Sequence, residues 1–150
     1  MTNKISDRDS VGFWAKRCYL AGRAMMDDAL RPHGIGATQW YILHQLAEVG
    51  PTMQRDLVLL LQIERATVSI IVANLVRKGL VEQSSDAVDQ RQKKLCLTPA
   101  GVTLWGELPD LHFIRTIAFD GFSDADIETA VRVLRTATEH LQHRMKENRA

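Results

Sequence analysis

Residues 51–101 read PTMQRDLVLLLQIERATVSIIVANLVRKGLVEQSSDAVDQRQKKLCLTPAG and contain three structural signals in a fixed order. A helical pattern over 53–61 comes first, and a turn at 62–64 separates it from a second helical pattern over 65–78. In the second pattern, apolar residues at helical spacing predict a buried face: Val68, Ile71, Val72 and Leu75. The opposite face is small and available, and it comprises Ala66, Ser69, Ile70, Ala73 and Arg77.

Gly79 is a good helix terminator, and two short strands are predicted after it, over 80–83 and 94–98. The polar loop between the strands carries Arg91 and Lys93. Two helices joined by a turn, followed by a hairpin with a basic tip, form the pattern of a winged helix-turn-helix. Such a unit places its second helix in the major groove of DNA and its hairpin against the backbone or the minor groove.

The same stretch resembles the MarR family of bacterial transcriptional regulators. The resemblance rests on four segments in order, RATVS at 65–69, KGLV at 78–81, DQR at 89–91 and LCLTPAG at 95–101. It extends over most of the chain, because the flanking helices also match in number and order. It implies a homodimer that binds a roughly palindromic operator, usually represses transcription, and releases DNA when a small molecule or an oxidant reaches it.

The predicted fold is mainly α with a small β-hairpin wing, that is, a winged helix-turn-helix flanked by dimerisation helices. We expect one domain over 1–150. Its DNA-binding lobe is expected at about 37–98, and its dimerisation helices at about 5–31 and 99–147.

The composition is that of an ordinary soluble protein, with 45% hydrophobic and 25% charged residues. No stretch approaches the ~20 apolar residues that span a bilayer, and the charged N-terminal residues leave no signal-peptide core. A cytoplasmic location is therefore predicted. The formal net charge of +1 does not by itself indicate a nucleic-acid binder, so the DNA prediction rests on the order of the motifs.

The first helix is predicted to carry more apolar surface than one lobe covers. Ser6 is expected to cap it, and it runs to about Leu30. Its predicted stripe comprises Val11, Trp14, Ala15, Cys18, Ala21, Met25 and Ala29. Further apolar residues lie outside this stripe, which indicates burial on more than one side and hence a partner subunit.

Capping residues and prolines set the other helix bounds. A helix is predicted over about 38–49, and Thr52 is expected to cap the first motif helix. Thr98 is expected to cap a helix over about 99–119 that Pro109 kinks or interrupts. Ser123 is expected to cap the last helix, whose stripe is Ile127, Ala130, Val131, Leu134, Ala137, Leu141 and Met145.

The predicted DNA contacts of the second motif helix are Arg65, Ala66, Thr67, Ser69, Ile70 and Arg77. Arg65 and Ser69 are expected to bond bases or phosphates, and Ala66 or Ile70 to touch a thymine methyl group. A role at the helix start or in packing is the alternative for Thr67.

Three residues depart from the family pattern. Ile70 stands where an arginine is frequent, so one charged contact per subunit is expected to be missing, and packing within the protein is its alternative role. Gln62 occupies a turn position often held by glycine, and Glu64 is a poor N-cap. The fold prediction is unaffected, but the detailed base contacts stay open.

Asp89 and Arg91 match the Asp-x-Arg motif of the family wing. The resemblance implies that Arg91 enters the minor groove, where the negative potential favours a guanidinium group, and that Asp89 braces the wing. Lys93 is a further expected DNA contact in the same loop. A solvated loop pair is the alternative for Asp89 and Arg91.

The resemblance also implies an effector pocket between the dimerisation helices and the DNA-binding lobe. The candidate lining residues are aromatic, cationic or thiol side chains: Trp14, Arg17, Cys18, Trp40, Tyr41, His44, His112 and Arg115. Aromatic rings with a few cations suit an aromatic carboxylate or a phenol. Core packing of each aromatic residue and solvation of the two arginines are the alternatives.

Other mechanisms have weaker support in the sequence. Cys18 lies beside Arg17, which favours a redox sensor, yet the reactive cysteine of the peroxide-sensing branch aligns near Gly12 instead. The histidine pair His140 and His143 lacks further ligands at a recognisable spacing, so neither a metal nor a cofactor is predicted.

An enzyme and a protein-interaction module are the two alternatives to a regulator. An enzyme would need a nucleophile with its base or a phosphate-binding loop, and no such local motif occurs. A winged-helix interaction module without specific DNA binding fits the modest charge and Ile70. Arg65, Arg91 and Lys93 argue against that module.

Overall fold

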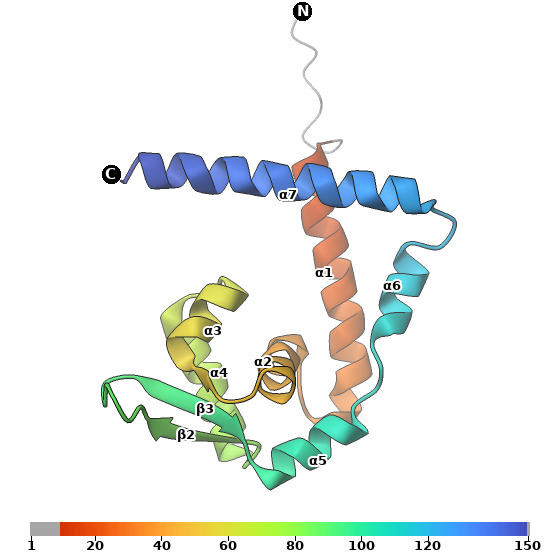
Figure 1. Cartoon of the computed structure of the whole chain (residues 1–150). Coiled ribbons are helices and arrows are strands. Elements are labelled where there is room, and N and C mark those ends of the chain that lie inside the picture. The colour runs from red at the N-terminus through yellow and green to blue at the C-terminus, as the bar shows by residue number, and fades with distance from the viewer. Residues whose placement is uncertain (1–9, 150) are drawn as a thin grey trace, which may run out of the picture. The chain divides into compact units, whose positions relative to one another are not determined.

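The computed structural model places residues 10–149, which form two compact units, one ending at Leu111 and one starting at His112 (Figure 1). In chain order the first unit contains α1 (Val11–Leu30), the short 3-10 helix η2 (Arg31–His33), α2 (Ala37–Glu48), β1 (Thr52–Met53), α3 (Gln54–Leu61), α4 (Arg65–Arg77), β2 (Val81–Ser85), β3 (Lys93–Leu97) and α5 (Pro99–Glu107). The second unit contains α6 (His112–Ala118) and α7 (Asp124–Glu147). The predicted class, mainly helical with a small β wing, is confirmed.

The core of the first unit fixes the orientation of α4 about its own axis. Val68, Val72 and Leu75 are buried, as predicted, and Ile71 is half-buried. They belong to a core to which the neighbouring elements contribute Ile42, Leu43, Leu46, Leu57, Val81 and Leu95. Each such side chain stabilises the fold by about 1.5–3 kcal/mol when fully buried. Turning α4 about its axis would expose this set, so its outer face is fixed.

The wing is a three-stranded antiparallel sheet in the order β1-β3-β2. The hairpin β2–β3 was predicted one residue out of place at several ends, and β1 was not predicted. The expectation that Thr52 caps α3 is wrong, because Thr52 pairs with Leu95 in the sheet. Its hydroxyl donates to the carbonyl of Gly50 at 2.9 Å, and Met53 stands at the N-cap position.

The first helix begins later than predicted. The expected cap Ser6 lies outside the placed residues, and Ser10 caps α1 by accepting a hydrogen bond from the backbone N–H of Phe13 at 3.1 Å. The predicted stripe does not pack within this unit, since its members are exposed or half-buried. The residues of α1 that are buried are Met26 and Leu30, at the end that contacts α2 and η2.

The predicted long helix after the wing is interrupted at Pro109, one of the two outcomes expected there. Thr98 caps α5 by accepting from the N–H of Gly101 at 3.0 Å, and α5 ends before Leu108. In the second unit, Ser123 caps α7 as expected, with Asp126 completing a capping box. None of the placed helices is long and apolar enough to cross a membrane.

Gly101 allows α5 to approach the start of the wing closely. The N–H of Thr98 donates to the carbonyl of Leu80 at 3.1 Å. A Cβ atom on residue 101 would lie 2.1 Å from that same carbonyl oxygen. The approach leaves no room for a side chain, so this junction between wing and α5 requires glycine.

Gly101→Ala should therefore lower the free energy of unfolding by about 1–3 kcal/mol, the usual cost of overpacking. Gly106 is the matched control, because it lies in the same helix and a Cβ there meets nothing within 4 Å. Gly106→Ala should raise the stability by about 0.5–1 kcal/mol through helix propensity. Urea unfolding followed by circular dichroism measures both changes, and equal effects of the two substitutions would contradict the steric account.

Candidate nucleic-acid interface and ligand cavity

The outer face of α4 is open to solvent along its length. All the predicted contacts on it are exposed: Arg65, Ala66, Thr67, Ser69, Ile70 and Arg77. Ile70 is 65% exposed, so its alternative role in packing within the lobe is wrong. Thr67 is exposed as well, and the N-cap position belongs to Glu64, which makes no side-chain capping bond.

The turn between α3 and α4 has an unusual backbone. Gln62 ends α3 with φ of 52°, in the left-handed region that favours glycine. That conformation costs a residue with a side chain roughly 1–2 kcal/mol. Gln62 therefore adopts the backbone conformation that a glycine would adopt at this position, and the turn is strained rather than different in geometry.

Aspartates hold the wing tip by their backbone contacts. The carboxylate of Asp86 accepts from the N–H groups of Val88 and Asp89, at 3.2 and 3.1 Å. These bonds, that from Asp89 first, lower the pKa of the Asp86 carboxyl. Asp89 in turn accepts from the backbone N–H of Arg91 at 3.1 Å. Asp89 thus holds the backbone of Arg91 and leaves its guanidinium group free.

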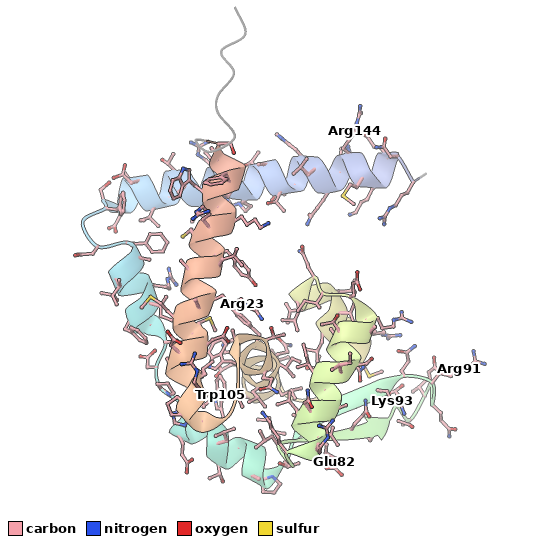
Figure 2. All side chains as sticks on the ribbon, turned by 180° about the vertical axis from the view of Figure 1, so that it is seen from behind. Arg23, Glu82, Arg91, Lys93, Trp105 and Arg144 are labelled. Carbon is pink, nitrogen blue, oxygen red and sulfur yellow. The ribbon has the colours of Figure 1, made fainter. Side chains whose placement is uncertain are left out.

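Asp86 was missed from the sequence, although an aspartate at the start of a polar loop commonly forms such a turn. Arg91 and Lys93 both lie on the wing, away from the body of the lobe (Figure 2). Within residues 10–149, neither of them has a carboxylate within 4 Å, and the same holds for Arg65 and Arg77. The outer face of α4 and the wing therefore present four cations without an internal counter-charge.

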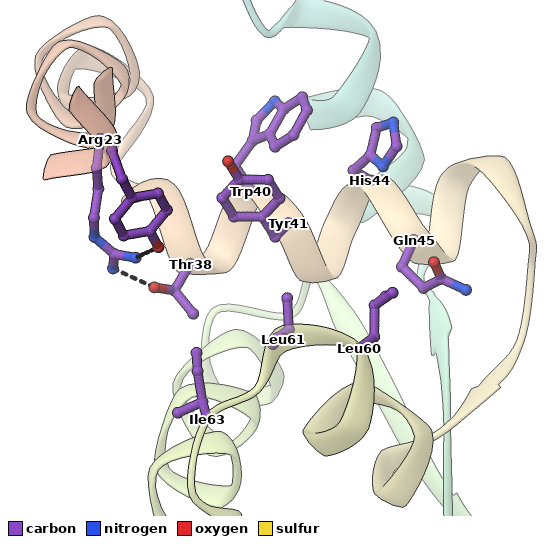
Figure 3. A pocket seen from close by; sticks show the side chains of 10 residues that line it. Arg23, Thr38, Trp40, Tyr41, His44, Gln45, Leu60, Leu61 and Ile63 are labelled. Carbon is purple, nitrogen blue, oxygen red and sulfur yellow. Dashed lines mark hydrogen bonds between the residues drawn. The ribbon is translucent and has the colours of Figure 1, made fainter. Parts of the chain in front are cut away.

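A cavity of about 580 Å³ lies in the first unit (Figure 3). Side chains from α1, α2 and the α3–α4 turn region line it: Tyr19, Arg23, Thr38, Trp40, Tyr41, His44, Gln45, Leu60, Leu61 and Ile63. Most of its lining surface is apolar, and Thr38 lies beside Arg23 at one end, whereas His44 and Gln45 lie toward the other end (Figure 3).

Arg23 is the charged group of this cavity. Its guanidinium donates to the hydroxyl of Thr38 and, at 3.3 Å, to that of Tyr19. Among the placed residues it has no carboxylate within 4 Å. Burial raises the pKa of the Tyr41 phenol, Tyr19 adds to the rise, and Arg23 opposes it. The cavity thus combines a neutral phenol with an unpaired cation.

Aromatic rings form one side of the cavity and continue into α5. The ring of Trp40 stacks on His44 with centroids 4.9 Å apart, and it lies 5.5 Å from Trp105. His44 and Trp105 are 5.7 Å apart, edge to face. Trp105 was not among the predicted residues, although its spacing from Thr98 places it in the predicted helix.

The predicted effector set is divided among three places. Trp40, Tyr41 and His44 line the cavity, whereas Trp14, Arg17 and Cys18 line a separate depression along α1. His112 and Arg115 belong to α6, in the second unit. Arg23 was not among the predicted residues, although its place one helical turn after Tyr19 sets the two side chains on one face of the helix.

Thiols and histidines give no sign of a metal site. Cys18 is exposed, and Cys96 is half-buried beside a groove that Trp105 also lines. His143 lies 3.4 Å from a carboxylate oxygen of Glu147. No group of three or more potential ligands gathers anywhere in the part of the chain that the structure describes.

Comparison with known proteins shows what the chain is similar to. A model of the MarR family matches residues 33–92, from η2 to the wing tip. One similar structure is AbsC, a MarR family transcriptional regulator from Streptomyces coelicolor, with a TM-score of 0.81 at 18% identity over 95% of this chain and 99% of that one.

Two further structures bear on what such proteins bind. BpsR from Bordetella bronchiseptica, described with regulation of its DNA binding by 6-hydroxynicotinic acid, is 26% identical, with a TM-score of 0.78 over 89% of this chain and 96% of that one. A MarR mutant from E. coli complexed with operator DNA is 17% identical, with a TM-score of 0.75 over 85% and 92%. A MarR family model thus matches the helix-turn-helix and most of the wing, and the chain has the fold of these winged-helix proteins.

Proposed function

We propose that this regulator binds a palindromic operator as a homodimer, represses transcription, and is released by an aromatic acid or phenol. The proposal that the protein binds DNA rests on the exposed outer face of α4, which has an arginine at each end that is unpaired among the placed residues. Regulators of this family are not enzymes, so binding alone has to account for the activity.

The side chains on α4 fit the chemistry of a major groove. Arg65 bonds guanine or a phosphate, Thr67 and Ser69 offer hydroxyl groups, and Ile70 supplies the apolar contact for a thymine methyl group. Arg91 on the wing suits the minor groove, where its guanidinium group meets negative potential. The operator complex of the E. coli relative shows that the same fold binds DNA.

The homodimer is supported by apolar surface that each of the two compact units leaves uncovered. No placed residue of α7 is buried, although the helix is 24 residues long. Its apolar stripe is exposed, including Leu134, Leu141 and Met145. On α1, Trp14 and Leu20 are exposed as well. Helices depend mainly on packing of an apolar face, so a second subunit is needed to cover these surfaces.

A dimer also accounts for the shape of the DNA site. Two recognition helices related by a two-fold axis contact half-sites about one helical turn apart, roughly 34–36 Å. The expected operator is therefore an inverted repeat. A compound that changes the separation of the two α4 helices would weaken binding to both half-sites at once.

The cavity beside Arg23 is the proposed effector site. Its volume of about 580 Å³ falls in the range of small-ligand pockets. An aromatic acid would stack on Trp40 and direct its carboxylate to Arg23, which lacks an internal counter-charge. The relative BpsR is described as regulated by 6-hydroxynicotinic acid, a compound of this chemistry.

The first turn of α2 connects this cavity to the end of α4. Thr38 accepts from Arg23 on the cavity side. The neighbouring residue Gln39 accepts from the ammonium group of Lys78 at 3.3 Å, directly after α4. Leu61 and Ile63, on the opposite wall, precede α4 in the chain. A ligand that draws Arg23 away from Thr38 would therefore act on both ends of α4.

The first prediction concerns DNA contacts. Arg65→Ala and Arg91→Ala should each weaken operator binding by about 1–3 kcal/mol, the scale of a groove contact. Arg31→Ala is the charge-matched control, because Arg31 lies in η2 and is already paired with Asp28 at 2.6 Å. Fluorescence anisotropy with duplexes from the upstream region of the gene, at two salt concentrations, measures the change.

Full affinity of both variants would remove α4 and the wing from DNA binding. Weak, sequence-blind binding of the unaltered protein without any ligand would favour the interaction module or a corepressor-dependent regulator.

The second prediction concerns assembly. Light scattering across a dilution series should give twice the chain mass of 16.9 kDa. Leu134→Glu should shift the protein toward the monomer, because it places a charge in the apolar stripe of α7. Thr136→Glu adds the same charge off the stripe and should leave the mass unchanged. A folded monomer at every concentration would rule out the dimer.

The third prediction concerns the effector. Aromatic carboxylates such as nicotinate or hydroxybenzoate should quench the fluorescence of Trp40 and release DNA, and their uncharged amides should not. Arg23→Gln should weaken carboxylate binding about 10- to 100-fold, as expected for a lost charged hydrogen bond. Arg17→Gln is the control, since Arg17 lies on the same helix outside the cavity. Equal weakening by both substitutions would contradict the assignment of Arg23.

A further inference from the structure

A chain of three hydrogen-bonded side chains joins the wing to the outer face of α4. The amide nitrogen of Gln83 in β2 donates to the amide oxygen of Gln54 at 2.7 Å. The amide nitrogen of Gln54, the first residue of α3, donates to the hydroxyl oxygen of Ser69 at 3.1 Å. Ser69 is one of the residues on the proposed DNA-binding face.

We propose that Gln54 is a positioning residue that directs the Ser69 hydroxyl toward DNA, and that Gln83 in turn holds Gln54. The proposal rests on DNA binding by α4. It adds two residues, neither of them on α4, to the determinants of operator affinity, and it makes the wing strand β2 a support for the recognition helix.

Ser69 differs from three threonines in the helices of residues 10–149. Thr103, Thr116 and Thr138 each donate to the carbonyl four residues earlier, at 3.1, 3.4 and 2.8 Å. That bond holds a hydroxyl against its own helix and away from a binding partner. Ser69 instead accepts from a side chain on another helix, and within residues 10–149 its own proton makes no hydrogen bond.

The remaining proton gives Ser69 a defined role. A hydroxyl that has accepted one bond still has a donor to offer. In the major groove the matching acceptors are N7 and O6 of guanine, N7 of adenine and O4 of thymine, and phosphate oxygens also accept. With Gln54 in place, Ser69 therefore enters the complex as an oriented donor and loses less rotational freedom on binding.

The chain of bonds does not serve to stabilise the fold. Gln83 and Ser69 are exposed, Gln54 is half-buried, and both hydrogen bonds are exposed to water. Exposed bonds of this kind exchange with water at little net gain. A structural role would also not explain why the three residues meet at the proposed DNA face. Loss of the bonds should appear in DNA affinity and not in stability.

The test is a double-mutant cycle on operator binding by the full-length protein. Gln54→Met keeps the length of the side chain and removes both hydrogen bonds. It should weaken binding about three- to tenfold, with an unchanged urea midpoint. In the Ser69→Ala background the same substitution should have no further effect, because Gln54 then has no hydroxyl to orient.

Arg65 provides the comparison cycle, since no contact joins it to Gln54 among the hydrogen bonds and ion pairs of residues 10–149. Gln54→Met and Arg65→Ala should therefore weaken binding independently. Gln83→Met should show the same dependence on Ser69 as Gln54→Met, with a smaller effect.

The outcomes separate this inference from the proposed function. If Arg65→Ala and Ser69→Ala both leave operator affinity unchanged, DNA binding by α4 fails, and the inference fails with it. If those two variants weaken binding while Gln54→Met binds at full strength, only the inference is overturned. It is also overturned if Gln54→Met is as damaging without the Ser69 hydroxyl as with it.

Discussion

Burial of one side of α4 is the constraint on which the rest of this structure depends. Val68, Val72 and Leu75 belong to a core shared with α2, α3 and the wing. Their burial allows α4 only one orientation about its own axis. The outer face follows from it, with arginines, small residues and hydroxyl groups exposed together. Packing and the proposed DNA recognition therefore use opposite sides of the same 13-residue helix.

The wing is ordered at both of its ends. Its far end is ordered by Asp86 and Asp89, which bind backbone N–H groups and fix the turn that carries Arg91. Its near end is fixed where α5 passes over the carbonyl of Leu80, an approach that only glycine at position 101 permits. Gln54 and Gln83 add a polar connection at the surface. A wing without these contacts would present Arg91 in many positions, at a cost in binding entropy.

The lobe was largely predictable from the sequence, because the spacing and capping signals that define its helices lie close together in the chain. The spacing of Val68 and Val72 gives the buried face of α4, and Thr98 with Pro99 marks the start of α5. The two-residue strand β1 was missed because pairing with β3, a contact distant in sequence, creates it. The cavity was predicted only in its α2 part, since Arg23 and Ile63 reach it from other segments through tertiary packing. The apolar stripe of α1 was visible in the sequence, but its lack of cover within its own compact unit was not.

In the proposed complex, two copies of α4 contact DNA as a two-fold pair. Selection of bound duplexes from a randomised DNA library by the full-length protein tests this pairing. An inverted repeat with half-site centres about 10–10.5 bp apart should be enriched and bound less tightly as salt rises. Enrichment of a single asymmetric site, or of no sequence at all, would contradict this pairing.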